Sequence, residues 1–75
     1  MTDRELLVYQ RLESAITDVS WGAYFCEFGF FVSVSIDGKE YVTSTVPSDP
    51  DSLDYSVLTI VDQIDKIRSK HNGNT

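Results

Sequence analysis

Few residues of this 75-residue chain could perform covalent or metal chemistry. Cys26 is the only cysteine and His71 the only histidine, and they lie far apart in the sequence. A nucleophilic thiol needs a base beside it, and a zinc site needs several converging ligands. Asp49, Asp51 and Asp54 suggest a calcium loop, but its glycine and terminal glutamate are missing. We therefore predict no catalytic residue, no metal and no cofactor, and we expect Cys26 to be a small buried hydrophobe.

One group of carboxylates is regular enough to indicate binding. At about 100° per residue, an expected second helix gathers four aspartates within an arc of about 80°, and a tyrosine and a leucine lie in or beside that arc: Asp51, Asp54, Asp62, Asp65, Tyr55 and Leu58. Such a face could imitate the negative charge of a nucleic acid backbone and dock on a basic groove, with Tyr55 and Leu58 as anchors. The alternative is an ordinary solvated helix face with a tolerated leucine.

The overall charge limits the classes of partner. Twelve acidic residues against six basic ones give a net charge of −6, which repels nucleic acid phosphates and anionic lipid headgroups. We predict no direct nucleic acid binding and no membrane association. The charge favours encounter with a basic protein surface, although acidic residues that serve solubility alone are the alternative. One cysteine and no signal peptide or apolar stretch of about 20 residues predict a cytoplasmic protein.

Two helices are expected to position these residues. Thr2-Asp3-Arg4-Glu5 has the form of a capping box, so the first helix should cover about 3–17. Its apolar stripe is Val8, Tyr9, Leu12, Ala15 and Ile16. Leu7 projects opposite the stripe and should be exposed or touch another chain. An Asp49 cap and Pro50 predict a second helix over about 50–70, with a frayed tail over 72–75 and an apolar stripe made of Leu53, Val57, Ile60, Val61, Ile64 and Ile67.

The middle of the chain is predicted to form strands. From 24 to 36 the even positions are apolar, which indicates a half-buried strand over about 23–36. Phe25 and Phe31 interrupt the polar pattern on the odd face, and Gly29 suggests a bulge or bend, so the run is one long bent strand or two. We expect Trp21 to be buried where the first helix meets the strand.

A hairpin should follow at Asp37-Gly38, with a returning strand over about 39–46. A two-residue turn would pair Val34 with Tyr41. A three-residue loop with a glycine bulge would pair Val34 with Val42 and Phe30 with Val46. We favour the bulged register, because it aligns apolar residues with apolar residues.

These elements predict a single small α+β domain of αββα, or αβββα, order, with both helices packed on one face of a short antiparallel sheet. Unpaired sheet edges beside apolar side chains favour pairing with another chain. A homodimer through Leu7, Phe25, Phe31 and Tyr41 is one expectation. The other is that the long strand bends and covers its own odd face.

Three functions from different classes follow. The first is an inhibitor that blocks a basic, nucleic-acid-handling partner through the acidic helix face. In general composition, and without a shared motif, the chain resembles the small acidic inhibitors that phages use against host defence or DNA-repair enzymes, including anti-CRISPR proteins and DNA mimics. The second is an adaptor or subunit that docks through its hairpin edge and outer aromatic face. The third is a small-ligand-binding dimer with a cleft lined by Phe25, Phe31 and Tyr41.

Overall fold

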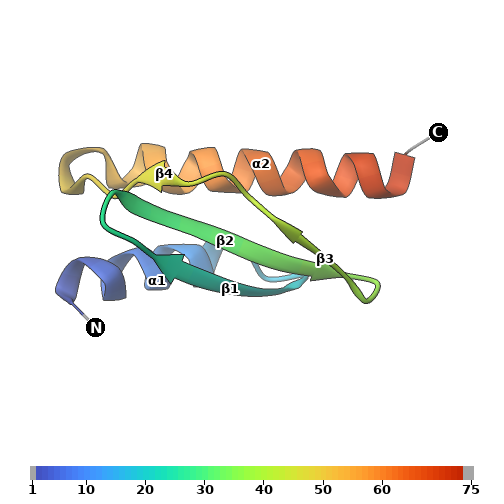
Figure 1. Ribbon diagram of the computed structural model, residues 1–75, viewed down its shortest axis with the longest axis horizontal. Helices are drawn as coiled ribbons and strands as arrows, with labels where there is room; N and C mark the ends of the chain where they lie inside the picture. Colours follow the sequence, from blue (N-terminus) through green and yellow to red (C-terminus); the bar gives the residue numbers. More distant parts are fainter. Residues whose placement is uncertain (1, 74–75) are drawn as a thin grey trace.

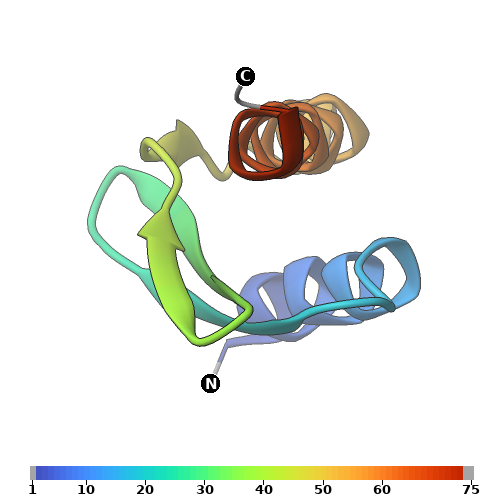
Figure 2. The same cartoon turned by 90° about the vertical axis from the view of Figure 1, so that its right-hand side faces the viewer.

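The computed structural model describes residues 2–73, which form an antiparallel sheet with two helices on the same side of it (Figures 1 and 2). The predicted α+β class and the packing of both helices on one sheet face are confirmed. In chain order the elements are α1 (Asp3–Ala15), β1 (Ser20–Phe25), β2 (Gly29–Ile36), β3 (Lys39–Val42), β4 (Val46–Pro47), the 3₁₀ turn η1 (Pro50–Ser52) and α2 (Leu53–Gly73). Neither helix is long and apolar enough to cross a bilayer within the described residues.

β2 is the central strand of the sheet. It pairs with β1 along one edge and with β3 and β4, end to end, along the other. The helices bury most of their predicted apolar stripes against the β2 side chains that point toward them, although Ala15 of the first stripe is exposed. The core consists of Val8, Leu12, Ile16, Phe30, Val32, Val34, Val46, Leu53, Val57, Ile60 and Ile64. Trp21 is half-buried and packs against this core, with its ring 5.0 Å from that of Tyr9.

Both helix starts follow the sequence signals. The Thr2 hydroxyl accepts a hydrogen bond from the Glu5 N–H, and the Glu5 carboxylate accepts one from the Thr2 N–H, which completes the capping box. Asp49 caps η1 by accepting a hydrogen bond from the Asp51 N–H. α1 ends at Ala15, slightly before the expected 17. α2 continues to Gly73, so Asn72 and Gly73 are helical rather than frayed, and residues 74–75 lie outside the described residues.

The run from 24 to 36 is not one strand. A turn over 26–28, closed by a hydrogen bond from the Cys26 N–H to the Gly29 carbonyl, separates β1 from β2. Phe25 pairs with Phe30, so four residues separate the paired positions. Because this number is even, odd positions face the core in β1 and even positions face it in β2. Cys26 therefore lies exposed in the turn, and the prediction that it is buried is wrong. Phe28 lies two residues later in the same turn and is 80% exposed.

Gly29 makes neither a bulge nor a bend. It pairs in regular register with Pro47 of β4. A Cβ placed on Gly29 would lie 1.8 Å from the carbonyl oxygen of Val46. Only a residue without a side chain allows the two backbones to approach so closely.

The hairpin register combines both sequence alternatives. Asp37 and Gly38 have φ values of 52° and 81° and form a two-residue turn, which pairs Val34 with Tyr41. The preferred pairing of Val34 with Val42 is therefore wrong. The pairing of Phe30 with Val46 is confirmed, because the extra residue lies further along the returning strand, between β3 and β4, and not in the turn.

Side chains satisfy the backbone at this bulge. Thr43 donates its N–H to the Val32 carbonyl at 2.9 Å, and its buried hydroxyl accepts a hydrogen bond from the Val32 N–H, also at 2.9 Å. The next N–H, of Ser44, bonds the side-chain oxygen of Gln63 on α2 at 2.7 Å. The bulge thus ties the returning strand to both β2 and α2.

Candidate protein-binding surfaces

The outward face of α2 is the first candidate surface. All six residues predicted there are exposed on the described chain. Tyr55 and Leu58 are 73% and 65% exposed, which is far more than either would be in a packed core. The helical projection therefore gave the correct side for the aspartates and for both anchors, listed by number as Asp51, Asp54, Tyr55, Leu58, Asp62 and Asp65.

Cations of the same chain interrupt this acidic face. Asp54 pairs with Arg11 of α1. Asp62 pairs with Lys66 at 3.1 Å, and Asp65 also carries an ion pair. Among the four aspartates of this face, Asp51 alone makes no ion pair with the described residues. Three of the four aspartates on this face are thus paired with cations of the same chain.

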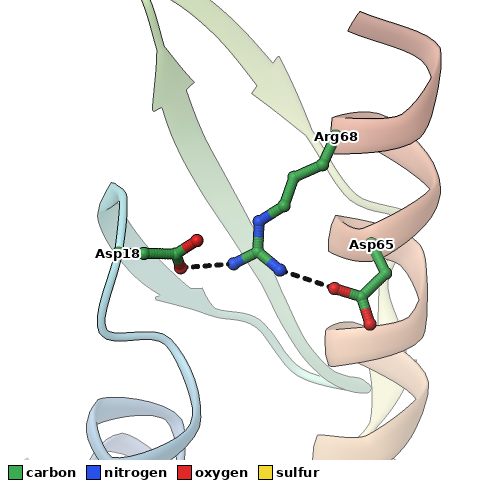
Figure 3. Close-up of polar contacts among 3 residues, drawn as sticks. All are labelled: Asp18, Asp65 and Arg68. Atoms are coloured by element: carbon green, nitrogen blue, oxygen red, sulfur yellow. Dashed lines mark hydrogen bonds and ion pairs between the residues drawn. The ribbon is translucent and has the colours of Figure 1, made fainter. Parts of the chain in front are cut away.

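Two arginines form ion pairs between separate elements. Arg68 of α2 places one guanidinium nitrogen 2.5 Å from Asp65 and another 2.6 Å from Asp18, in the segment between α1 and β1 (Figure 3). Arg11 likewise joins α1 to Asp54. Asp62 and Asp65, in contrast, pair only with residues of their own helix. Asp51, Asp62 and Asp65 can therefore be changed without removing an ion pair between elements, whereas Asp54 cannot.

Leu7 is on α1, beside the start of α2, and does not adjoin the outer face of the sheet. It is 43% exposed, as the sequence predicts. With Arg11, Asp54 and Tyr55 it lines a hollow of about 440 Å³ between the starts of the two helices. Any partner that covers Tyr55 from this side also reaches Leu7.

The outer face of the sheet is the second candidate surface. Tyr24 and Phe31 are cross-strand partners whose rings stack at 5.3 Å. Tyr24 is 51% exposed, and Val42 on β3 is 60% exposed. Sequence reasoning found Phe31 but missed Tyr24 and Val42. The alternation contains the signal for Tyr24 once the turn over 26–28 is recognised, and for Val42 once the two-residue turn at Asp37 and Gly38 is recognised.

Phe25 and Tyr41 lie on the other side of the sheet. Both pack against the core, because β1 carries its core residues at odd positions and the two-residue turn places Tyr41 opposite the core residue Val34. Their expected position on the outer face beside Phe31 is therefore wrong. The three aromatic side chains do not line a common cleft within one protomer.

Tyr41 is further held by the only histidine. Its hydroxyl lies 2.8 Å from Nδ1 of His71, and Nε2 of His71 lies 3.0 Å from a carboxylate oxygen of Asp37. This chain of contacts fastens the hairpin turn to the end of α2. The turn that carries Cys26 lies at the opposite end of the molecule (Figure 1), so the thiol and the imidazole do not meet.

Within residues 2–73 no group of three or more His, Cys, Asp or Glu side chains is arranged to hold a metal ion. The comparisons with known proteins add no functional information. No protein-family model matches the chain, and neither a curated protein nor a solved structure matches it significantly.

Proposed function

We propose that the chain is a non-enzymatic, cytoplasmic binding module that inhibits a nucleic-acid-handling protein by covering its basic surface. The observation that carries this proposal is the exposure of Tyr55 and Leu58 among aspartates on one helix face. Aromatic and aliphatic side chains that lose all contact with water are the usual energetic centres of interfaces. Surrounding charges then select the partner and accelerate encounter.

The ion pairs on this face are compatible with such binding. Exposed pairs contribute only about 0–1 kcal/mol each, so an arginine of a partner can replace Arg11 or Lys66 at little cost. Net charge is also unaffected by pairing, and −6 on a small protein attracts a basic surface from a distance. The proposal thus rests on anchors with complementary charge and not on imitation of phosphate spacing.

The resemblance in composition to small phage inhibitors suggests which partners to test first. These are host-defence nucleases, CRISPR effectors among them, and DNA-repair enzymes. In each case the expected mode of action is occlusion of the positively charged channel that holds nucleic acid.

The test variant combines Asp51→Asn, Leu58→Ser and Asp62→Asn, because none of these residues links separate elements. A matched control, Asp3→Asn with Glu13→Gln, also removes two negative charges, in this case from α1, where both residues are exposed. Affinity for a captured basic partner should fall at least tenfold in the test variant and by less than about twofold in the control. Equal affinities of the two variants would contradict the proposal.

An adaptor function is the second candidate, and a specific observation favours it. Among the described residues β1 pairs only with β2, and its residues, Ser-Trp-Gly-Ala-Tyr-Phe, include no charge and no proline. Natural edge strands commonly carry charged residues or proline, which prevent unwanted pairing. A partner strand that pairs with β1 would lie beside the exposed Tyr24 of that strand. Binding would then be nearly independent of salt and would be lost on Ala23→Pro, with no effect of the α2 variant.

A further inference from the structure

The two most exposed large apolar side chains of the described residues lie at one end of the molecule. Phe28 is 80% exposed and Tyr55 is 73% exposed. They come from separate elements, the turn between β1 and β2 and the first turn of α2. Figure 1 shows these two elements on either side of β4 at the end of the molecule opposite the hairpin turn. At 80% exposure Phe28 contributes little to the core and is accessible to a partner.

Two adjoining hollows lie between the two side chains. One hollow of about 550 Å³ is lined by Phe28, Phe25 and Pro47, among others. A second, of about 380 Å³, is lined by Tyr55, Val46 and Pro47. Pro47 and Asp49 line both hollows. The two hollows adjoin there and are together called the groove. Its floor is partly apolar, and an exposed aromatic side chain lines each hollow.

Charges around the groove are mostly negative. Glu5, Glu27 and Asp49 line the larger hollow, and Arg4 is the only basic residue that does so. Asp51 is also exposed next to Asp49. An occupant with positive charges beside an apolar side chain would match both the rim and the floor.

Backbone contacts fix the position of two walls of the groove. Gly29 holds β2 directly against β4, and the hydrogen bond from Cys26 to Gly29 closes the turn that presents Phe28. Little ordering is then required on binding, which favours affinity. The short dimensions of the molecule are 21 and 18 Å, so an extended segment of about six residues, at about 3.3 Å each, would cross this end.

We propose that this groove binds an extended segment of a partner protein in which Arg or Lys flanks an aromatic or large aliphatic residue. The inference rests on the proposed function, since it specifies how a basic partner is recognised. The apolar side chain of the segment sits between Phe28 and Tyr55 over Pro47. Its basic groups face the carboxylates of Glu27 and Asp49.

Selection of a random 12-residue peptide library on the immobilised full chain tests the inference. The enriched peptides should carry Arg or Lys beside an aromatic or aliphatic residue. Binding of one synthetic peptide, followed by fluorescence anisotropy, should weaken at least tenfold on Phe28→Ser, and Glu27→Gln should reduce its salt dependence. Phe28 is so exposed that its replacement leaves the fold intact, which circular dichroism verifies.

Val42→Ser is the matched control, because it removes an apolar side chain of similar exposure from the outer sheet face. It should leave peptide affinity unchanged. The inference is overturned if no peptide is enriched, if the enriched peptides lack basic residues, or if Phe28→Ser binds as tightly as Val42→Ser.

Failure of this inference is distinguishable from failure of the proposed function. Leu58 and Asp62 do not line the groove. A basic partner that is lost on changing these two residues but is indifferent to Phe28→Ser would remove the groove and leave the function. Peptides that bind through Phe28, with partner capture indifferent to Leu58 and Asp62, would keep the groove and remove the α2 face.

Discussion

Replacement of Gly29 by alanine should destabilise this protein more than any other change of one methyl group in the sheet. The added Cβ would lie 1.8 Å from the carbonyl oxygen of Val46 and 2.9 Å from Cα of Pro47, whereas real Cβ contacts essentially never fall below 3.0 Å. The obstructing atoms belong to the backbone, so no side-chain rotation can relieve the contact. β4 must retreat from β2 by roughly 1 Å or more.

The cost follows from what β4 contributes. Retreat breaks a two-residue pairing and withdraws Val46, which is 6% exposed, from the core. Overpacking commonly costs about 1–3 kcal/mol, and complete burial of a valine is worth about 1.5–3 kcal/mol, part of which is lost. We expect a decrease of about 3 kcal/mol in the free energy of unfolding. At about 0.05–0.15 kcal/mol per residue, total stability is only roughly 4–11 kcal/mol.

Gly22→Ala is the control for this experiment. The three atoms nearest to a Cβ at Gly22 all belong to the Tyr24 side chain and lie at 3.6 Å or more, which is ordinary contact. Alanine in place of glycine in a strand is otherwise neutral or slightly stabilising, by up to about 1 kcal/mol. Urea unfolding followed by circular dichroism and Trp21 fluorescence gives both free energies. Stabilities of the two variants within about 0.5 kcal/mol of each other would refute the argument from close approach.

Three further changes test contacts that join the elements. Thr43→Val leaves the buried N–H of Val32 without its acceptor and should lower the free energy of unfolding in urea by about 2 kcal/mol. The control, Thr45→Val at an exposed position, should lower it by less than about 0.5 kcal/mol. Equal losses would show that the hydroxyl at the bulge is dispensable. Arg68→Lys cannot span both of its carboxylate partners and should lower stability by about 1 kcal/mol, an effect that 1 M salt should reduce; no loss would mean that the bridge in Figure 3 carries no energy. Tyr41→Phe removes the hydroxyl beside the imidazole and should cost about 1 kcal/mol, with faster amide hydrogen exchange in the hairpin turn; unchanged exchange would contradict a clamp between the turn and α2.

The helices were predictable because their signals are local. A capping box, an Asp-Pro start and apolar residues at helical spacing all act within a few residues of one another. The same projection placed Tyr55 and Leu58 on the solvent side of α2. Two of the ion pairs on that face, Asp62 with Lys66 and Asp65 with Arg68, also have helical spacing and could have been recognised from it.

The break between β1 and β2 was concealed by the sequence itself. Tyr24, Cys26, Phe28 and Phe30 continue an unbroken alternation through a turn that contains no proline, asparagine or glycine. The turn also reverses which positions face the core, so one missed turn misplaced both Phe25 and Cys26. Similarly, the bulge between β3 and β4 depends on Thr43 bonding another strand, which no local pattern reveals.

The groove between Phe28 and Tyr55 lies further beyond sequence reasoning. Its walls come from the start of α1, the turn between β1 and β2, and the segment from β4 to η1. These segments are distant in the chain, and the close approach of β4 to β2 at Gly29 helps to bring them together. Helical and strand periodicity describe one element at a time, and therefore cannot bring such residues together.

Affinity capture from a host-cell lysate, with elution along a salt gradient, tests the central claim most directly. The tagged wild-type chain is compared with the Asp51→Asn, Leu58→Ser, Asp62→Asn variant and with the α1 control that removes equal charge. The proposed function predicts a basic, nucleic-acid-handling protein that elutes from the wild type and the control at moderate salt and is absent from the variant. A partner retained at high salt by all three chains would contradict it and would point to the outer sheet face.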